Sequence, residues 1–210
     1  FSSRRRHTRF RNVTGVQTCA LPICDRAPKA LRYAELLSTT AIERGLIGPK
    51  EGERIWDRHI ENCLPVSTLF PKEVSVADIG SGAGLPGIVI ALARPDLRIT
   101  LIEPLARRCE FLFEVIDELK LEIEVIRGKS EALKGRYDYL TARAVAPLGR
   151  LIETTWHLLS PSGSLFAMKG ESASAELAET DLRAVAKNEL HEIKMADIPV
   201  SRVVELVKAG

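Results

Sequence analysis

The chain has 210 residues, of which 45% are hydrophobic and 28% carry a charge, and its formal net charge is +2. These values fit one globular domain that is long enough to bury a sizeable core. No apolar run is long enough to span a membrane, which excludes a protein with transmembrane helices.

The first 24 residues differ in composition from the rest of the chain. They contain five arginines and no acidic residue, and they show neither helical nor strand periodicity. Residues 13–23, VTGVQTCALPI, resemble the in-frame translation of a sequencing-library adaptor, so we expect residues 1–24 to be a foreign or disordered tail. A signal peptide is disfavoured because Pro22 and polar residues interrupt the apolar stretch, and a nucleic-acid-binding arm is the other alternative.

Without this tail, 25 basic residues stand against 28 acidic ones, a net charge of −3. Nucleic-acid binding therefore requires a local basic patch rather than the field of the whole domain. The cysteines outside the tail, Cys63 and Cys109, are far apart and form no C-x-x-C motif, which favours reduced thiols in a reducing compartment. We expect a cytoplasmic protein that is monomeric and has no metal site.

Two helices are predicted to form an N-terminal helical cap, residues 25–72, before a core of residues 73–210. The first covers residues 28–44, ends before Gly45, and has apolar residues at helical spacing, namely Leu31, Ala34, Leu37 and Ala41. The second begins at Pro49, and two alternative groups of residues lie on its neighbouring turns: Ile55, His59 and Cys63, or Ile55, Ile60 and Leu64.

The core alternates between strand and helix patterns. Strands are predicted at residues 74–79 with Asp78 at the end, 98–104 with Glu103 at the end, 123–128, 137–145 and 164–170. Helices are predicted at 86–93, 106–121, 148–159 and 172–188, with a short turn or helix at 130–133, a turn at 161–163 and a closing hairpin of 191–198 and 203–209. This order predicts a doubly wound α/β fold with a mostly parallel sheet.

The stretch 76–87, VADIGSGAGLPG, joins a strand to a helix through four glycines, Gly80, Gly82, Gly84 and Gly87. Glycine lacks a Cβ atom and tolerates positive φ, so we expect the loop to point its N–H groups at a ligand. A dinucleotide site needs Gly-x-Gly-x-x-Gly, but here Leu85 follows the first glycines. Asp78 followed by Gly-x-Gly-x-Gly is typical of S-adenosylmethionine (SAM) sites, and an ordinary glycine-rich turn is the alternative.

Three later strand ends carry candidate cofactor-binding residues. Glu103 lies where an acid can accept hydrogen bonds from both ribose hydroxyls, with a solvated strand end as the alternative. Ser130 and Glu131 can flank an adenine or form a helix N-cap. Arg143 ends the fourth strand beside the switch point of the sheet, where a charged residue needs either a ligand or an ion-pair partner.

Basic residues near the same edge are candidates for nucleic-acid binding. Lys169 ends the fifth strand, although a lysine in this place often points into water. Lys129, Arg107 and Arg108 complete a basic rim, each with a solvated side chain as the alternative. The pattern around His59 favours a histidine that packs between helices over one that reaches the cleft.

Methyl transfer from a sulfonium needs a placed acceptor in a dry pocket, so positioning supplies most of the rate and no catalytic residue is assigned. The chain has no Asp/Asn-Pro-Pro-Tyr after the fourth strand to hold an exocyclic amine, and no Pro-Cys there to attack a pyrimidine. An acceptor with its own lone pair fits better. Guanine N7 is such an acceptor and needs no general base, and the sequence permits it without proving it.

Six segments in this order resemble the RsmG (GidB) family in its actinobacterial form: WDRHIENC, VADIGSGAGLPG, LIEPLARRCEFL, IRGKSEAL, ARAVAPL and AMKGE. The resemblance covers nearly all of residues 27–210. It implies a class I SAM-dependent methyltransferase that acts on guanine N7 in 16S small-subunit ribosomal RNA, as free RNA or in the 30S particle.

The resemblance also implies roles for single residues. The family's SAM-binding positions fall on Gly80, Leu85, Ser130, Glu131 and Arg143, with Glu103 as the ribose acid. Its RNA-facing positions fall on Lys129 and Lys169, and Lys129 stands where arginine is expected, a real change if that side chain forks onto a phosphate. Two rival functions are a SAM enzyme with a small-molecule or protein acceptor, favoured by the charge of −3, and a SAM-binding module without catalysis.

Overall fold

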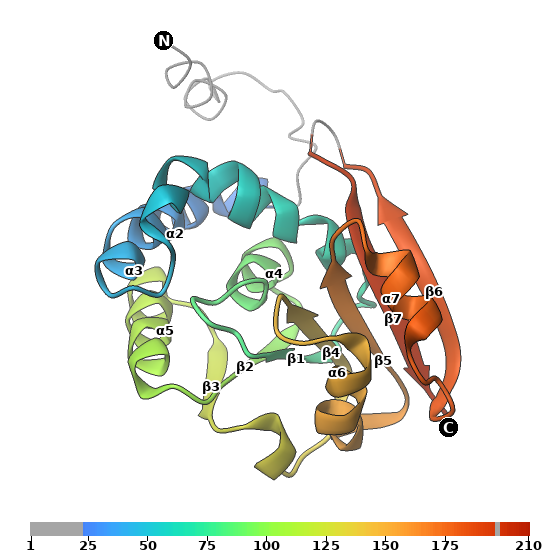
Figure 1. Cartoon of the computed structure of the whole chain (residues 1–210). Coiled ribbons are helices and arrows are strands. Elements are labelled where there is room, and N and C mark those ends of the chain that lie inside the picture. The colour runs from blue at the N-terminus through green and yellow to red at the C-terminus, as the bar shows by residue number, and fades with distance from the viewer. Residues whose placement is uncertain (1–22, 196–197) are drawn as a thin grey trace.

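The computed structural model describes residues 23–195 and 198–210 (Figure 1). Its centre is a seven-stranded sheet with the order β3-β2-β1-β4-β5-β7-β6. Strands β1 to β5 are parallel to one another, whereas β7 is antiparallel to both β5 and β6. The predicted doubly wound, mostly parallel sheet is confirmed.

The strands are β1 Ser75–Ile79, β2 Arg98–Glu103, β3 Ile123–Arg127, β4 Tyr137–Arg143, β5 Leu159–Lys169, β6 Val185–Ile193 and β7 Ser201–Lys208. The α-helices are α2 Ala27–Ser38, α3 Thr40–Glu43, α4 Gly87–Ala93, α5 Ala106–Leu119, α6 Leu148–Thr155 and α7 Ala173–Glu179. Shorter helical turns are η2 Cys24–Arg26, η3 Pro49–Arg54, η4 Ile55–Glu61, η5 Pro65–Leu69, η6 Ser130–Ala132 and η7 Trp156–Leu158. No helix within residues 23–195 and 198–210 combines the length and apolar character needed to cross a bilayer.

Alternation along the strands divides the core into two layers, because successive side chains point to opposite faces of the sheet. Val76 of β1 and Phe166 of β5 join one hydrophobic cluster with α2, α4 and α5. Ala77 and Leu165, their neighbours in the chain, join a second cluster with α6 and α7. Figure 1 shows these helices on the two sides of the sheet. The parallel strands all end at one edge, where their loops meet.

The cap is less regular than predicted. The first helix breaks at Thr39, which has φ −116° and ψ −86°. Leu31 is 45% exposed, because the stripe that packs against the core runs through Ala30 and Tyr33 instead. The second predicted helix is a 3₁₀ turn followed by the π-helix η4. Its buried residues Ile55 and Ile60 are five positions apart, the spacing of one π turn.

The predicted helix at 172–188 is wrong beyond Glu179. Residues from Val185 onward form the edge strand β6, which pairs with β7 in the predicted closing hairpin. This strand is mostly exposed and shows no apolar alternation, so its pairing partner decides its conformation. The predicted turn at 161–163 lies within β5, beside a shift of register against β4. Residues 196–197 of the predicted hairpin lie outside the described part.

Candidate functional site

The glycine-rich loop between β1 and α4 lies at the carboxyl ends of the parallel strands, where the strand order reverses between β1 and β4. Gly80, Gly82 and Gly84 have φ values of +65°, +62° and +96°, which other residues rarely adopt. A Cβ atom on Gly82 would meet nothing closer than the Gly80 carbonyl at 3.8 Å. One on Gly84 would overlap Ile88 and lie 2.9 Å from the Tyr33 hydroxyl. Glycine at position 82 therefore leaves the space beside the loop backbone open, whereas glycine at position 84 lets Ile88 and Tyr33 pack closely against the loop.

Most N–H groups of this loop bond within the protein. They are those of Gly80, Ser81, Gly82, Gly84, Leu85 and Gly87. Their acceptors are the carbonyls of Ile102 and Ser81 and the carboxylates of Glu103 and Asp78. A phosphate cradle needs free N–H donors, so a pyrophosphate does not fit these residues. The expectation that the loop points its N–H groups at a ligand is wrong here, and a ligand meets bare backbone instead.

Asp78 is fully buried at the end of β1. Its Oδ2 atom accepts a hydrogen bond from the Gly87 N–H at 3.0 Å, whereas Oδ1 is buried without a partner. Burial raises the pKa of this carboxyl group to about 7, against the opposing hydrogen bond from Gly87. A buried carboxylate oxygen with no donor is costly, so this atom marks a place for a donor or a cation.

Glu103 lies at the end of β2, as the sequence predicts, and the structure shows that it is fully buried there. Its Oε1 accepts from the Leu105 N–H and its Oε2 from the Gly82 N–H, both at 2.9 Å. The Arg108 guanidinium lies 3.4 Å from Oε2. A carboxylate offers about four acceptor sites, so Glu103 holds the loop in place and keeps capacity for a ligand hydroxyl.

Three buried side-chain atoms in the described residues lack a hydrogen-bond partner, and all three lie near the carboxyl ends of the parallel strands. They are Asp78 Oδ1, Thr141 Oγ1 and Arg108 Nε. Thr141 is the β4 partner of Asp78 in the sheet, and Arg108 contacts the acid at the end of β2. Unpartnered buried polar groups are rare in native structures. An acceptor, a hydroxyl and a cationic donor together suit a ligand with amino, carboxyl and hydroxyl groups.

The predicted adenine-flanking and basic-rim residues lie on the same side of the sheet edge but differ in exposure. Ser130 is buried, and its hydroxyl donates to the exposed Glu131 carboxylate at 3.3 Å. Lys129 and Arg107 are exposed, whereas Arg108 is paired with the acid at the end of β2. The basic rim therefore divides into exposed cations and one engaged in the site.

Arg143 joins the end of β4 to the cap. Its guanidinium donates to the Arg58 carbonyl at 3.0 Å and to the Cys63 sulfur at 3.2 Å, and lies 3.2 Å from His59 Nδ1. Burial, and then the charge of Arg143, lowers the pKa of His59. A neutral imidazole can accept from Arg143 at Nδ1 and donate from Nε2 to Glu51, 3.1 Å away. The partners that Arg143 finds are thus a carbonyl, a thiol and an imidazole.

Lys169 is held at the end of β5 rather than free in solvent. Its ammonium group donates to the Ala146 carbonyl and to Glu176 Oε1, both at 2.8 Å, and its side chain is 13% exposed. The same Glu176 oxygen accepts the Leu148 N–H at 2.6 Å, at the start of α6. Glu176 therefore connects α7 to two strand-end segments, and RNA contact by Lys169 stays a prediction.

A pocket of about 500 Å³ lies beside these residues, and we call it the strand-end pocket. It is lined by residues 144–147, Lys169 and the α7 side Ser172, Ala175, Glu176 and Glu179. Val145 in its wall is 43% exposed and would lie 3.0 Å from a Cβ atom on Gly80. The strand-end pocket therefore adjoins the glycine-rich loop.

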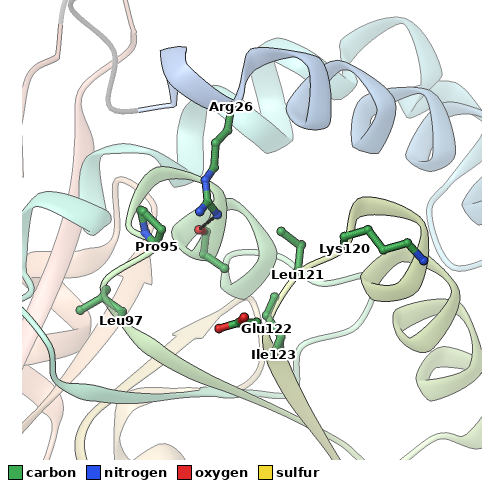
Figure 2. Close-up of a pocket in the computed structure, with 8 residues that line it drawn as sticks. Arg26, Pro95, Leu97, Lys120, Leu121, Glu122 and Ile123 are labelled. Carbon is green, nitrogen blue, oxygen red and sulfur yellow. Dashed lines mark hydrogen bonds between the residues drawn. The ribbon is translucent and has the colours of Figure 1, made fainter.

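A smaller cavity of about 170 Å³ lies elsewhere (Figure 2). Leu97 in its wall precedes β2 and Ile123 opens β3, so the cavity is at the amino ends of these strands. The guanidinium of Arg26 reaches toward the Ala91 carbonyl there, at 3.5 Å. It lies at the opposite edge from the loop and is separate from the candidate site.

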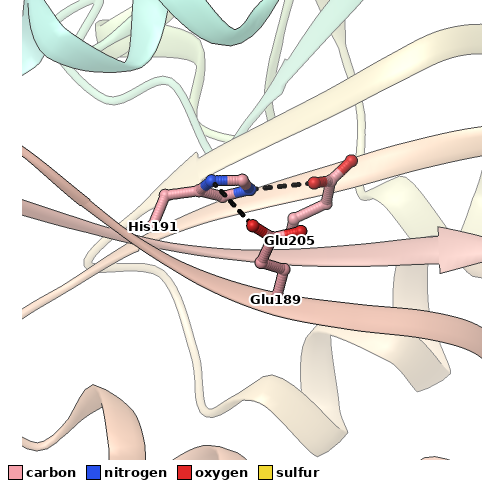
Figure 3. Close-up of side chains that lie close together, drawn as sticks. All are labelled: Glu189, His191 and Glu205. Carbon is pink, nitrogen blue, oxygen red and sulfur yellow. Dashed lines mark hydrogen bonds and ion pairs between the residues drawn. The ribbon is translucent and has the colours of Figure 1, made fainter.

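Glu189, His191 and Glu205 lie together on the β6–β7 hairpin, with potential metal ligands within 4.8 Å of one another (Figure 3). His191 Nε2 is 2.8 Å from the Glu205 carboxylate, which also accepts from the Ser164 hydroxyl at 2.9 Å. Glu189 pairs with Lys187 at 2.9 Å. These contacts already occupy the group, and the absence of a metal site stays a prediction.

Sequence reasoning missed three residues of this region. Tyr33 is fully buried, and its hydroxyl donates to the Ala83 carbonyl at 2.8 Å, so α2 of the cap is fastened to the loop. A tyrosine in an apolar stripe needs a partner for its hydroxyl, which was an available signal. Thr141 and Glu176 carried no local signal, because their neighbours come from other elements.

Comparison with known proteins gives a consistent result. A family model described as GidB, "rRNA small subunit methyltransferase G", matches residues 26–202. Proteins named "Ribosomal RNA small subunit methyltransferase G" from Nocardioides sp. and Streptomyces avermitilis are 52% and 48% identical to this chain over 156 and 191 residues. The alignments cover 73% and 87% of this chain, and 62% and 80% of the relatives. The chain thus spans less than two thirds of the Nocardioides protein.

Solved structures share the fold at low identity. A methyltransferase from Pyrococcus furiosus has a TM-score of 0.58 at 12% identity and covers 89% of this chain and 99% of its own. The tRNA (m1A58) methyltransferase TrmI from Aquifex aeolicus has a TM-score of 0.57 at 11% identity, covering 71% and 69%. At such identities the likeness concerns the architecture alone.

Proposed function

Because this chain belongs to the GidB family, the rRNA small subunit methyltransferase G proteins, we propose that it transfers a methyl group from SAM to N7 of a guanine in 16S ribosomal RNA. This proposal is carried by the set of unpartnered polar atoms beside a loop most of whose N–H groups are already bonded. This arrangement suits a cofactor that has amino, carboxyl and hydroxyl groups but no phosphate. The substrate is the free RNA or the 30S particle.

We assign SAM binding to the loop and the strand ends around it. The residues are Asp78, Gly80, Gly82, Gly84, Leu85, Glu103, Ser130, Glu131 and Arg143. The unpartnered Asp78 oxygen suits the cationic amino group, and Glu103 keeps acceptor capacity for a ribose hydroxyl. Ser130 and Glu131 flank the adenine. Arg143 acts by fixing the cap against β4, through its bonds to Arg58 and Cys63.

Bound at this site, SAM supplies a methyl group on a positively charged sulfur. Guanine N7 attacks with its own lone pair and carries no proton, so no residue of the chain has to act as a general base. The protein contributes by placing both partners and by excluding water. Exposed Lys129 and Arg107 are available for phosphate contacts, which position the RNA without reading its sequence.

We further propose one methyltransferase domain of residues 25–210, with residues 25–72 as its cap, acting as a monomer in the cytoplasm. The cap and the core share one hydrophobic cluster, which includes Leu37 of α2 and Ile88 of α4. Residues 1–22 lie outside the described part. Ile23 is fully buried in this cluster, so the deletion that tests the tail removes residues 1–22 alone. It should leave methylation unchanged, and a large loss of activity would favour the basic-arm alternative.

The test incubates the protein with methyl-labelled SAM and small subunits from a strain that lacks the modification. We expect label on N7 of one guanine after digestion of the 16S RNA. No label in RNA, or label on another atom, contradicts the proposal. Label in a protein or small-molecule fraction would instead support one of the rival acceptors.

A matched pair of variants tests the cofactor site. Glu103→Gln should weaken SAM binding about 10-fold or more, because a charge-assisted hydrogen bond is lost at a buried position. Glu110→Gln changes an exposed acid on α5, seven residues later in the chain, and should leave the SAM dissociation constant unchanged. Isothermal titration calorimetry measures both, and equal affinities in the two variants would remove Glu103 from the site.

A further inference from the structure

We propose that the strand-end pocket receives the acceptor guanine and reads its Watson–Crick edge, with Glu179 accepting from N1–H and the 2-amino group and Lys169 donating to O6. This inference rests on the proposed function and adds the residues that select the base.

The strand-end pocket lies where an acceptor must lie. Residue 144 directly follows β4, Lys169 ends β5, and Val145 in the pocket wall packs over Gly80 of the loop. Its volume of about 500 Å³ is within the range of roughly 300–1,000 Å³ that small-molecule sites occupy. Enzymes that modify a base of structured nucleic acid bring that base out of its stack into such a pocket.

Lys169 offers one donor to this pocket. An ammonium group has three N–H bonds, and two of them are used by the Ala146 carbonyl and by Glu176. The third is free for an acceptor in the pocket that Lys169 lines. Because Glu176 balances the charge of Lys169 at 2.8 Å, this donor is presented without a net positive charge.

Glu179 offers the matching acceptors. It is exposed, it lines the pocket, and it makes no hydrogen bond or ion pair within residues 23–195 and 198–210. It lies three residues after Glu176 on α7, so the two carboxylates occupy the same side of the helix. The free carboxylate of Glu179 and the free N–H of Lys169 therefore belong to neighbouring groups.

The Lys169 donor and the Glu179 acceptor are complementary to the Watson–Crick edge of guanine and not to that of adenine. Guanine presents an acceptor at O6 next to donors at N1 and the 2-amino group, whereas adenine presents a donor at N6 and an acceptor at N1. The Watson–Crick edge is separate from N7, so binding by this edge leaves N7 free to react. Methylation at N7 makes the base cationic, and the Glu179 carboxylate favours that charge.

The experiment compares Glu179→Gln with Glu171→Gln, an exposed acid just before α7 that does not line the pocket. Methyl transfer to unmodified small subunits gives kcat/KM, and calorimetry gives the affinities for SAM and for guanosine, inosine and adenosine 5′-monophosphates. Inosine lacks the 2-amino group. We expect wild-type protein to prefer the guanine nucleotide over the other two by about 10-fold, the size of one bidentate contact.

Glu179→Gln should lose this preference and about 10-fold in kcat/KM, with SAM affinity unchanged. Glu171→Gln should match wild type in nucleotide preference, kcat/KM and SAM affinity. Wild-type rate and preference in Glu179→Gln overturn the inference, as does equal binding of the three nucleotides by wild-type protein. If wild-type protein does not methylate guanine N7, the proposed function fails, and the nucleotide preferences still decide whether the pocket reads guanine.

Discussion

Replacement of Asp78 by asparagine tests whether the site holds a buried charge at the expense of stability. Asparagine keeps the size of the side chain and an oxygen that can accept from the Gly87 N–H, but its amide group does not ionise between pH 5 and pH 8. Burial raises the pKa of Asp78 from 3.8 to about 7. The contribution of this group to stability is therefore complete below pH 3.8 and is lost as the pH rises to 7. The shift corresponds to about 4 kcal/mol in total, of which about 2.5 kcal/mol develops between pH 5 and pH 8.

Urea unfolding at pH 5 and pH 8 measures the effect. The free energy of unfolding of Asp78→Asn relative to wild type should rise by about 2–3 kcal/mol between the two pH values. Asp117→Asn, at an exposed position on α5, should show no such rise. The SAM affinity of Asp78→Asn should fall meanwhile, because the cationic amino group loses its counter-charge. A difference from wild type that is the same at both pH values would refute the reasoning.

Three further predictions concern the loop, the cap and the pocket wall. Gly82→Ala puts a Cβ atom into open space at positive φ and should lower the free energy of unfolding by about 1–2 kcal/mol. Gly84→Ala should lower it further, because its Cβ atom overlaps Ile88. Equal losses for the two variants in urea unfolding would contradict this. The lowered pKa of His59 means that its contribution to stability is present above pH 6.5 and declines as the pH falls, so His59→Gln should lose less stability than wild type between pH 7 and pH 5. Unchanged pH dependence in that variant would count against it. Glu176→Ala strands the Lys169 ammonium and should lower the free energy of unfolding by about 2–4 kcal/mol, and a loss below about 1 kcal/mol would be inconsistent with the contacts described.

Features that depend on neighbours along the chain were predictable from the sequence. The five parallel strands, the glycine-rich loop after β1 and the position of Glu103 at the end of β2 all follow from short apolar runs and from the glycine spacing. The glycine spacing also disfavoured a dinucleotide site, because Leu85 disrupts the dinucleotide pattern, and SAM binding by this loop stays a prediction.

Features that depend on contacts between distant segments were decided by the tertiary structure. The sequence could not indicate that Arg143 bonds to the cap carbonyl of Arg58, 85 residues away, or that Lys169 is paired with Glu176. It also predicted helix for residues that become β6, since an exposed edge strand takes its conformation from the strand beside it. The sequence by itself determined the glycine-rich loop and the order of strands and helices, because these are local patterns. The partners of each charged residue, and the pocket they form, exist only when the strand ends meet at one edge of the folded sheet.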